Sequence, residues 1–123
     1  MRKLLLTAFL LAALASLAGC ASQSSVPGGP LPATVPGLAE GVHFAGGDGS
    51  SQEHAVIVLG ATEPTGVEAE YLWLRVQYPG YKLIRQGLIQ GKDGKSFDIL
   101  EFSTPDGAKH SVYFDITDYF GKM

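Results

Sequence analysis

The sequence predicts an α+β fold, a two-layer sandwich in which one helix covers a four-stranded, mainly antiparallel sheet in the order β-α-β-β-β. Three observations carry this prediction. One stretch repeats apolar side chains at helical spacing, and four others are rich in β-branched and aromatic residues. Glycine-containing turn signals separate the last three of these four stretches, so they are expected to form a meander.

The first strand is expected at residues 54–60, "HAVIVLG". Its apolar residues run without interruption and end at Gly60. A continuous apolar run is typical of a strand that is covered on both faces or placed centrally in its sheet.

The helix is expected at residues 65–78. Thr65 followed by Glu68 matches a capping box, and Pro79-Gly80 ends the segment because the residue before a proline avoids the helical region. Apolar residues recur along one stripe, which Leu72 and Val76 widen; its members are Val67, Tyr71, Leu74 and Tyr78.

The remaining strands are expected at residues 81–90, 96–103 and 109–116. Asp93-Gly94 supplies a hairpin turn between the first two, and Pro105-Asp106-Gly107 supplies the next turn. In the last strand the residues predicted to face the core alternate with polar ones; they are His110, Val112, Phe114 and Ile116.

Two smaller features complete the predicted domain. Gly87 interrupts its strand, which indicates a bulge or a close approach of the helix. The closing segment "TDYFGKM" is expected to turn Tyr119 and Phe120 under the sheet.

The segment before the domain differs in composition. Residues 20–51 hold four prolines among glycine, serine and alanine, at positions 27, 30, 32 and 36. Prolines at this density oppose helices and sheet ladders, so the segment is predicted to be a semi-extended tether. The folded domain is then expected to occupy residues 52–123.

Residues 1–19 have the features of a secretory signal peptide. Arg2 and Lys3 precede an apolar run of 16 residues, 4–19. As a helix this run would be about 24 Å long, which is short of the ~30 Å hydrocarbon core of a bilayer. A positive flank, a short apolar stretch and small residues at its end indicate a cleaved leader.

The end of the leader, Leu17-Ala18-Gly19-Cys20, resembles the lipobox of bacterial lipoproteins. The resemblance covers only these first residues. It implies a diacylglycerol on the Cys20 sulfur, cleavage between Gly19 and Cys20, and acyl chains such as palmitate that anchor the protein in a membrane. The alternative is an ordinary leader with a cysteine near its cleavage site by chance. Ala21, where an aspartate would favour the inner membrane, implies the periplasmic face of the outer membrane.

Composition limits the partners. Without Arg2 and Lys3, the basic residues fall from 9 to 7 against 12 acids, a net charge near −5. The remaining basic residues are scattered, so we expect no nucleic-acid binding. Cys20 is the only cysteine, so the domain is expected to fold without an internal disulfide.

Neither a metal site nor a catalytic site is predicted. His43, His54 and His110 match no local ligand spacing, and no cofactor motif occurs. No Gly-x-Ser-x-Gly elbow is present. Paired carboxylates are conceivable among Asp98, Glu101, Asp115 and Asp118, but capping of a turn is favoured for the last two.

Aromatic residues provide the candidate binding surface. Trp73 falls off the predicted helical stripe, and Tyr113 faces away from the predicted core. Together with Arg75 and Tyr81 they are interpreted as a protein- or glycan-binding patch. The alternative is that these rings only cover a small core.

The sequence therefore favours a lipid-anchored, non-enzymatic envelope protein whose domain binds or inhibits another envelope protein. A structural or assembly accessory, or a module that binds peptidoglycan or another glycan, is the second hypothesis. A small hydrolase or metal-binding protein is the third. The third requires that two or more of His54, His110, Asp115 and Asp118 converge on one pocket.

Overall fold

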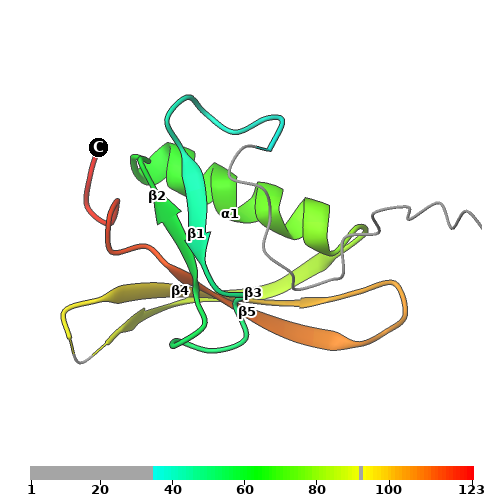
Figure 1. Ribbon diagram of the computed structural model, residues 1–123. Coiled ribbons are helices and arrows are strands. Elements are labelled where there is room, and N and C mark those ends of the chain that lie inside the picture. The colour runs from blue at the N-terminus through cyan, green and yellow to red at the C-terminus, as the bar shows by residue number, and fades with distance from the viewer. Residues whose placement is uncertain (1–34, 92) are drawn as a thin grey trace, which may run out of the picture.

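The computed structural model describes residues 35–91 and 93–123. It has one helix packed on a five-stranded mixed sheet, so the predicted α+β class is confirmed (Figure 1). The elements in chain order are β1 (His43–Gly46), β2 (Val56–Leu59), α1 (Glu63–Gln77), β3 (Lys82–Gln90), β4 (Ser96–Ser103) and β5 (Lys109–Asp115). Within these ranges no helix is long and apolar enough to span a membrane.

The strand order in the sheet is β1-β2-β5-β4-β3. The predicted meander is confirmed, because β3 pairs with β4 and β4 with β5, both antiparallel. The helix carries the chain from β2 to the opposite edge of the sheet, and the meander then returns to β2. After two reversals β5 runs in the same direction as β2, so these central strands pair in parallel.

The expectation of four strands was wrong because residues 43–46, assigned to the tether, form a fifth. β1 pairs antiparallel with β2 from His43↔Leu59 to Gly46↔Val56. Val42 and Phe44 bury their side chains in the core, and Val35 is also buried. A strand of four residues with one buried side chain, Phe44, is too short to stand out in a segment dominated by proline and glycine. The ordered domain thus includes residues placed in the tether.

Beyond the residues that pair in β1 and β2, the backbones at Gly41 and Gly60 lie very close to each other. Gly60 has a φ of +73°, and a Cβ at this position would collide with the carbonyl oxygen of Gly41. A glycine is therefore required here both for its backbone conformation and for space. This explains why the continuous apolar run of β2 stops at Gly60.

The helix begins two residues earlier than predicted. Thr62 is the N-cap residue, and its N–H donates to Oγ1 of Thr65 over 2.9 Å. Pro64 lies in the first turn, where a missing N–H costs no intrahelical hydrogen bond. Thr65 is therefore the third helical residue rather than the cap, and its partner in the capping interaction is Thr62 rather than Glu68.

The buried face of the helix is rotated relative to the predicted stripe. Its buried residues are Gly66, Ala69, Glu70, Trp73, Leu74 and Gln77. Trp73, expected on the surface, is only 1% exposed; its ring meets Phe114 edge-on, with centroids 5.5 Å apart. The largest side chain of the helix takes the centre of the core because it buries the most apolar area there.

The sheet contributes alternate side chains to the same core. Val112 and Phe114 of β5 face the helix as predicted, and the aromatic ring of His110 stacks on Phe102 of β4. Gly87 does not mark a bulge. It pairs regularly with Ile99, and the irregularity in β3 lies between Leu83 and Arg85.

The helix covers only part of the sheet. It packs on β2 and β5, and the core continues into β4 through Leu100 and Phe102. In β3, by contrast, every residue except Ile89 is exposed. Figure 1 shows the β3–β4 hairpin extending beyond the start of α1, at the end of the molecule where the C-terminal segment also lies.

Candidate functional site

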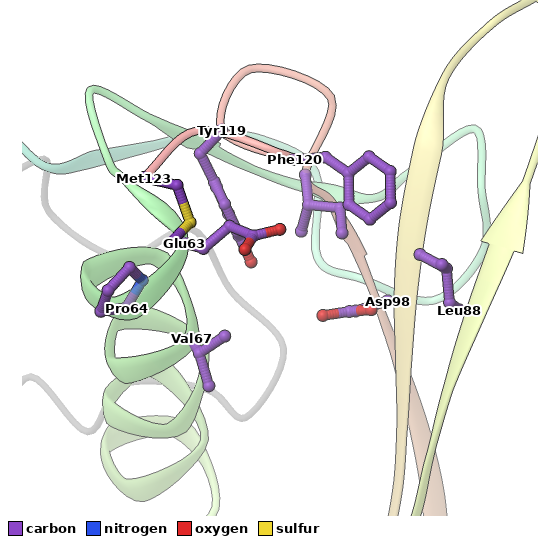
Figure 2. A pocket seen from close by; sticks show the side chains of 9 residues that line it. Glu63, Pro64, Val67, Leu88, Asp98, Tyr119, Phe120 and Met123 are labelled. Atoms are coloured by element: carbon purple, nitrogen blue, oxygen red, sulfur yellow. The ribbon is translucent and has the colours of Figure 1, made fainter.

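A groove of about 560 Å³ lies between the first turns of α1, the β3–β4 hairpin and the C-terminal segment (Figure 2). Most of the described side chains that line it are apolar, and the charged ones among them are carboxylates. The lining residues are Glu63, Pro64, Val67, Leu88, Asp98, Ile116, Tyr119, Phe120 and Met123.

The register of the hairpin places two of these side chains together. Leu88 of β3 is the direct partner of Asp98 on β4, so both project from the helix-facing side of the sheet. Figure 2 shows Asp98 pointing from its strand into the space between the sheet and α1, with Val67 across from it. The groove therefore has an apolar wall on β3 and a carboxyl group beside it on β4.

The C-terminal segment closes one end of the groove. Hydrogen bonds tie it to the start of the helix: Glu63 N–H donates to the carbonyl oxygen of Lys122 over 2.7 Å, and Gly121 N–H donates to Oε1 of Glu63 over 3.0 Å. Phe120, 42% exposed, stands at the rim, whereas Tyr119 is buried as predicted for this turn.

Tyr119 reaches the core across a glycine of the helix. A Cβ on Gly66 would lie 2.5 Å from carbon atoms of the Tyr119 ring, so a larger residue would displace this ring. The hydroxyl of Tyr119 then donates to Oε2 of Glu70 over 3.0 Å. A helical glycine is costly for helix stability, and here it makes this contact possible.

Glu70 is a fully buried carboxyl group. Its side chain is 0% exposed, and its Oε1 atom has no hydrogen-bond partner of ordinary geometry. Burial raises the pKa of Glu70 to about 9, and the neighbouring carboxyl of Asp98 adds to the increase. Glu70 is therefore protonated at neutral pH.

Asp98 is the second member of the pair and is 7% exposed. Burial raises its pKa, whereas interactions with Glu70 and Gln86 oppose this increase by favouring the charged form. Nε2 of Gln86 donates to Oδ2 of Asp98 over 3.2 Å, and Oε1 of Gln86 accepts from the hydroxyl of Tyr71 over 2.8 Å. At neutral pH the pair thus carries one proton on Glu70 and one negative charge on Asp98.

No cation neutralises this charge within the described part of the chain. The ion pairs found there lie elsewhere: Arg85 with Glu101, at 2.6 Å, and Lys122 with Asp118, at 3.9 Å. A poorly solvated negative charge without a cationic partner is costly, and it favours the entry of a cation from outside.

The predicted aromatic patch is not formed as a single surface. Trp73 is in the core, and Tyr113 lies on the sheet face opposite the helix, since its neighbours in β5 face the helix. Tyr81 is half-buried against Phe102, with ring centroids 5.8 Å apart. Of the four predicted residues only Arg75 is fully exposed.

The two histidines singled out for metal binding make local contacts. Nδ1 of His54 lies 3.0 Å from Oγ of Ser51, and Nε2 of His110 lies 3.1 Å from Oγ1 of Thr104. His54 precedes β2, whereas His110 is in β5 and stacks on the core. Neither contact is a ligand arrangement. His54 and Asp115 do line one common pocket, together with Glu53 and Lys95, whereas His110 and Asp118 are not among the described residues that line it.

The two aspartates at the end of the last strand bind polypeptide groups. Oδ1 of Asp115 accepts from both the N–H and the hydroxyl of Thr117, over 3.0 and 2.6 Å, so the predicted turn capping is confirmed for Asp115. For Asp118 the contact is distant in sequence instead of a local cap: its Oδ2 accepts from the N–H of Gly60 over 3.0 Å. Residues 35–91 and 93–123 contain no cluster of three or more His, Cys, Asp or Glu side chains suited to a metal ion.

The sequence contained a signal for the carboxyl pair that its interpretation missed. Glu70 falls outside the predicted stripe, yet it lies on the same face as Gly66, Trp73 and Gln77 at spacings of three and four. Centring the stripe on Trp73 would have placed a carboxyl group in the core. Its pairing with Asp98 could not be read from the helix.

Comparison of this chain with protein-family models, with curated proteins and with solved structures finds no match. The lipobox residues, including Gly19 and Cys20, lie outside the described residues. The functional conclusion therefore has to come from the sequence motif and from the geometry of the groove and the sheet.

Proposed function

We propose that this protein is a lipoprotein of the cell envelope, anchored through acyl chains on Cys20, and that its domain binds another envelope protein as a non-enzymatic interaction or inhibitor module. The lipobox at the end of a signal peptide supports the anchor, and Ala21 supports the periplasmic face of the outer membrane. Two or three acyl chains would give stable attachment, whereas one chain binds only reversibly.

The observation that carries the binding function is the uncovered end of the sheet. Large apolar side chains remain exposed on the helix-facing side of β3 and at the rim of the groove: Leu83, Leu88 and Phe120 are 41%, 51% and 42% exposed. Ile84, 54% exposed, lies beside Arg85 and Ser111 on the other face. Exposed apolar side chains on one side of a small domain are typical of an interaction surface. β3 is also an edge strand, whose outer backbone groups can pair with another chain.

A protein partner is favoured over a glycan by the position of the aromatic residues. Glycan recognition commonly depends on exposed aromatic rings, and the only tryptophan is buried in the core. The exposed apolar side chains of β3 are aliphatic, which suits contact with apolar side chains of a protein.

Site-specific photo-crosslinking in the native cells tests this proposal. A photoreactive amino acid replaces Leu88 in one variant and Ser111 in the other. Both positions are exposed, but Leu88 lines the groove on the helix-facing side of the sheet, whereas Ser111 lies on β5, on the opposite face. We expect one dominant crosslinked envelope protein from position 88, absent from position 111 and reduced by Cys20→Ser.

Two results would overturn the proposal. Equal crosslinking at the two positions would mean that the uncovered end of the sheet is not a binding surface. A crosslinked partner that is unaffected by Cys20→Ser, in a protein that stays at the membrane, would remove the role of the lipid anchor.

A further inference from the structure

The groove combines two properties that suit one class of ligand. Its walls are apolar over most of their extent, with Pro64 and Val67 on the helix, Leu88 on β3 and Ile116 at the end of β5. Its charged lining groups, Glu63 and Asp98, are both acidic. An aliphatic chain that ends in a cation would match both the walls and the charge.

Of the two acidic groups, Asp98 is the one available for a cation. Glu63 is already engaged, because its Oε1 accepts from the N–H of Gly121. Asp98 is held by Gln86 and by the neighbouring Glu70, and no basic side chain of the described chain contacts it. Its carboxylate therefore lines the groove without a countercharge.

A second observation points to the same place. Glu70 lies next to Asp98 and is completely buried, and its protonated carboxyl group is a donor to Asp98. This donor is neutral, so it favours the charged form of Asp98 without supplying a countercharge. Asp98 itself is only 7% exposed, and a cation that entered the groove would supply the positive charge.

From this geometry we infer that the groove binds a lysine or arginine side chain of the partner protein. The aliphatic part of that side chain packs against Val67 and Leu88, as the stems of basic residues do on apolar surfaces, and its charged group pairs with Asp98. This inference rests on the proposed function, since it specifies how the interaction module recognises its partner.

The inference is tested with small probes rather than with the unidentified partner. The protein is the chain from residue 20 onward with Cys20→Ser. The two probes are Nα-acetyl-lysine amide and Nα-acetyl-norleucine amide, which share the aliphatic chain and differ in the ammonium group. Binding is followed by changes in the backbone amide NMR signals of Leu88 and Asp98.

We expect the lysine probe to bind about tenfold more tightly than the norleucine probe, because only its ammonium group can donate a hydrogen bond to the carboxylate of Asp98. Asp98→Asn should abolish this preference. Glu101→Gln is the matched control: it removes one carboxylate from the same strand, and Glu101 lies on the opposite face, paired with Arg85. It should leave the preference unchanged.

A second variant tests the inference if Asp98→Asn fails to fold. Leu88→Lys places an ammonium group directly opposite Asp98 in the strand register. Because Leu88 is 51% exposed, this change should leave the domain folded. Its own lysine should occupy the groove and weaken binding of the lysine probe by at least about tenfold.

The inference is overturned if neither probe perturbs the groove, if the norleucine probe binds as tightly as the lysine probe, or if the preference survives in Asp98→Asn or Leu88→Lys. Failure of this inference can be told apart from failure of the proposed function. Crosslinking at position 88 with no lysine preference would leave the interaction module in place and remove only the basic side chain. Probe binding without a crosslinked partner would remove the interaction module and leave only a groove that binds cations.

Discussion

The two ends of the sheet differ in what covers them. Beneath α1, the strands β2 and β5 and the inner residues of β4 bury their apolar side chains, whereas β3 is exposed along nearly its whole length. A helix is about 10 Å wide and strands lie about 4.8 Å apart, so one helix cannot cover five strands. The covered end therefore holds the domain together, and the uncovered end is free to bind.

The difference extends to the polar residues. On the covered end the helix buries a tryptophan in an apolar core, and at the boundary it buries Glu70 beside Asp98. A small domain without disulfides has little stability to lose, so a buried carboxyl pair at this boundary is an expensive feature. We interpret its presence as a sign that the boundary serves recognition.

The largest effect is expected from Trp73→Ala, which removes the largest side chain of the core between α1 and the sheet. Loss of a buried aromatic side chain costs about 3–5 kcal/mol of unfolding free energy, enough to unfold a domain of this size. Urea denaturation followed by circular dichroism measures it. Arg75→Ala, on the exposed face of the same helix, should change stability by less than about 0.5 kcal/mol. Similar losses in both variants would contradict the assigned face of the helix.

The second prediction concerns pH. The pKa of Glu70 is raised from 4.5 to about 9 in the folded protein, so the folded state keeps a proton that the unfolded chain releases at lower pH. The contribution of Glu70 to the free energy of unfolding should therefore be most favourable below pH 4.5. It should decline as the pH rises toward about 9.

Glu70→Gln should remove that decline and make the domain more stable than the parent by about 2 kcal/mol at pH 8. Glu68→Gln, an exposed neighbour on the helix, is the control and should follow the parent curve. Denaturation curves collected across this pH range provide the comparison. Parallel curves for the parent and Glu70→Gln would show that the carboxyl group is not buried as described.

A smaller loss is expected from Gly66→Ala. Alanine is the better helix former by about 1 kcal/mol, but its Cβ would press on the Tyr119 ring. We expect a net destabilisation of about 1–2 kcal/mol, measured by thermal unfolding. A gain in stability would mean that the C-terminal segment yields easily and does not close the groove.

The smallest effect is expected on the uncovered end. Leu88→Ala should change stability by less than about 1 kcal/mol because the side chain is half-exposed, whereas Leu100→Ala, fully buried on the adjacent strand, should cost about 2–5 kcal/mol. Urea denaturation of the pair measures the contrast between the two ends directly. Equal costs would remove the distinction on which the proposed function depends.

Most of the secondary structure could be predicted from local patterns. The strands at 82–90, 96–103 and 109–115 follow from alternating residues separated by strong turns, and Gly107 has the positive φ that its turn requires. β1 could not be predicted, since Phe44 shows its role only through pairing with Val58 of β2. Its proline- and glycine-rich surroundings indicate a tether.

The pairing of Glu70 with Asp98 could not be predicted from the sequence for a related reason. The helical stripe was drawn through Tyr71 and Tyr78 because they are apolar enough to count as core, and this excluded Glu70 from the buried face. The position of Asp98 depends on the sheet order, which local patterns do not determine. Two polar residues that share a buried site cannot be recognised while each is treated as a surface residue.

The central claim is that a protonated, fully buried Glu70 lies beside an ionised Asp98 that lines the groove. The most direct test is a ¹³C NMR titration of the side-chain carboxyl carbons of Glu70 and Asp98 across the stable pH range. The structure predicts that Glu70 keeps its proton to a pKa of about 9 and that Asp98 ionises first. Titration of Glu70 near 4.5, its ordinary pKa, would contradict the account of the groove and of the ligand it binds.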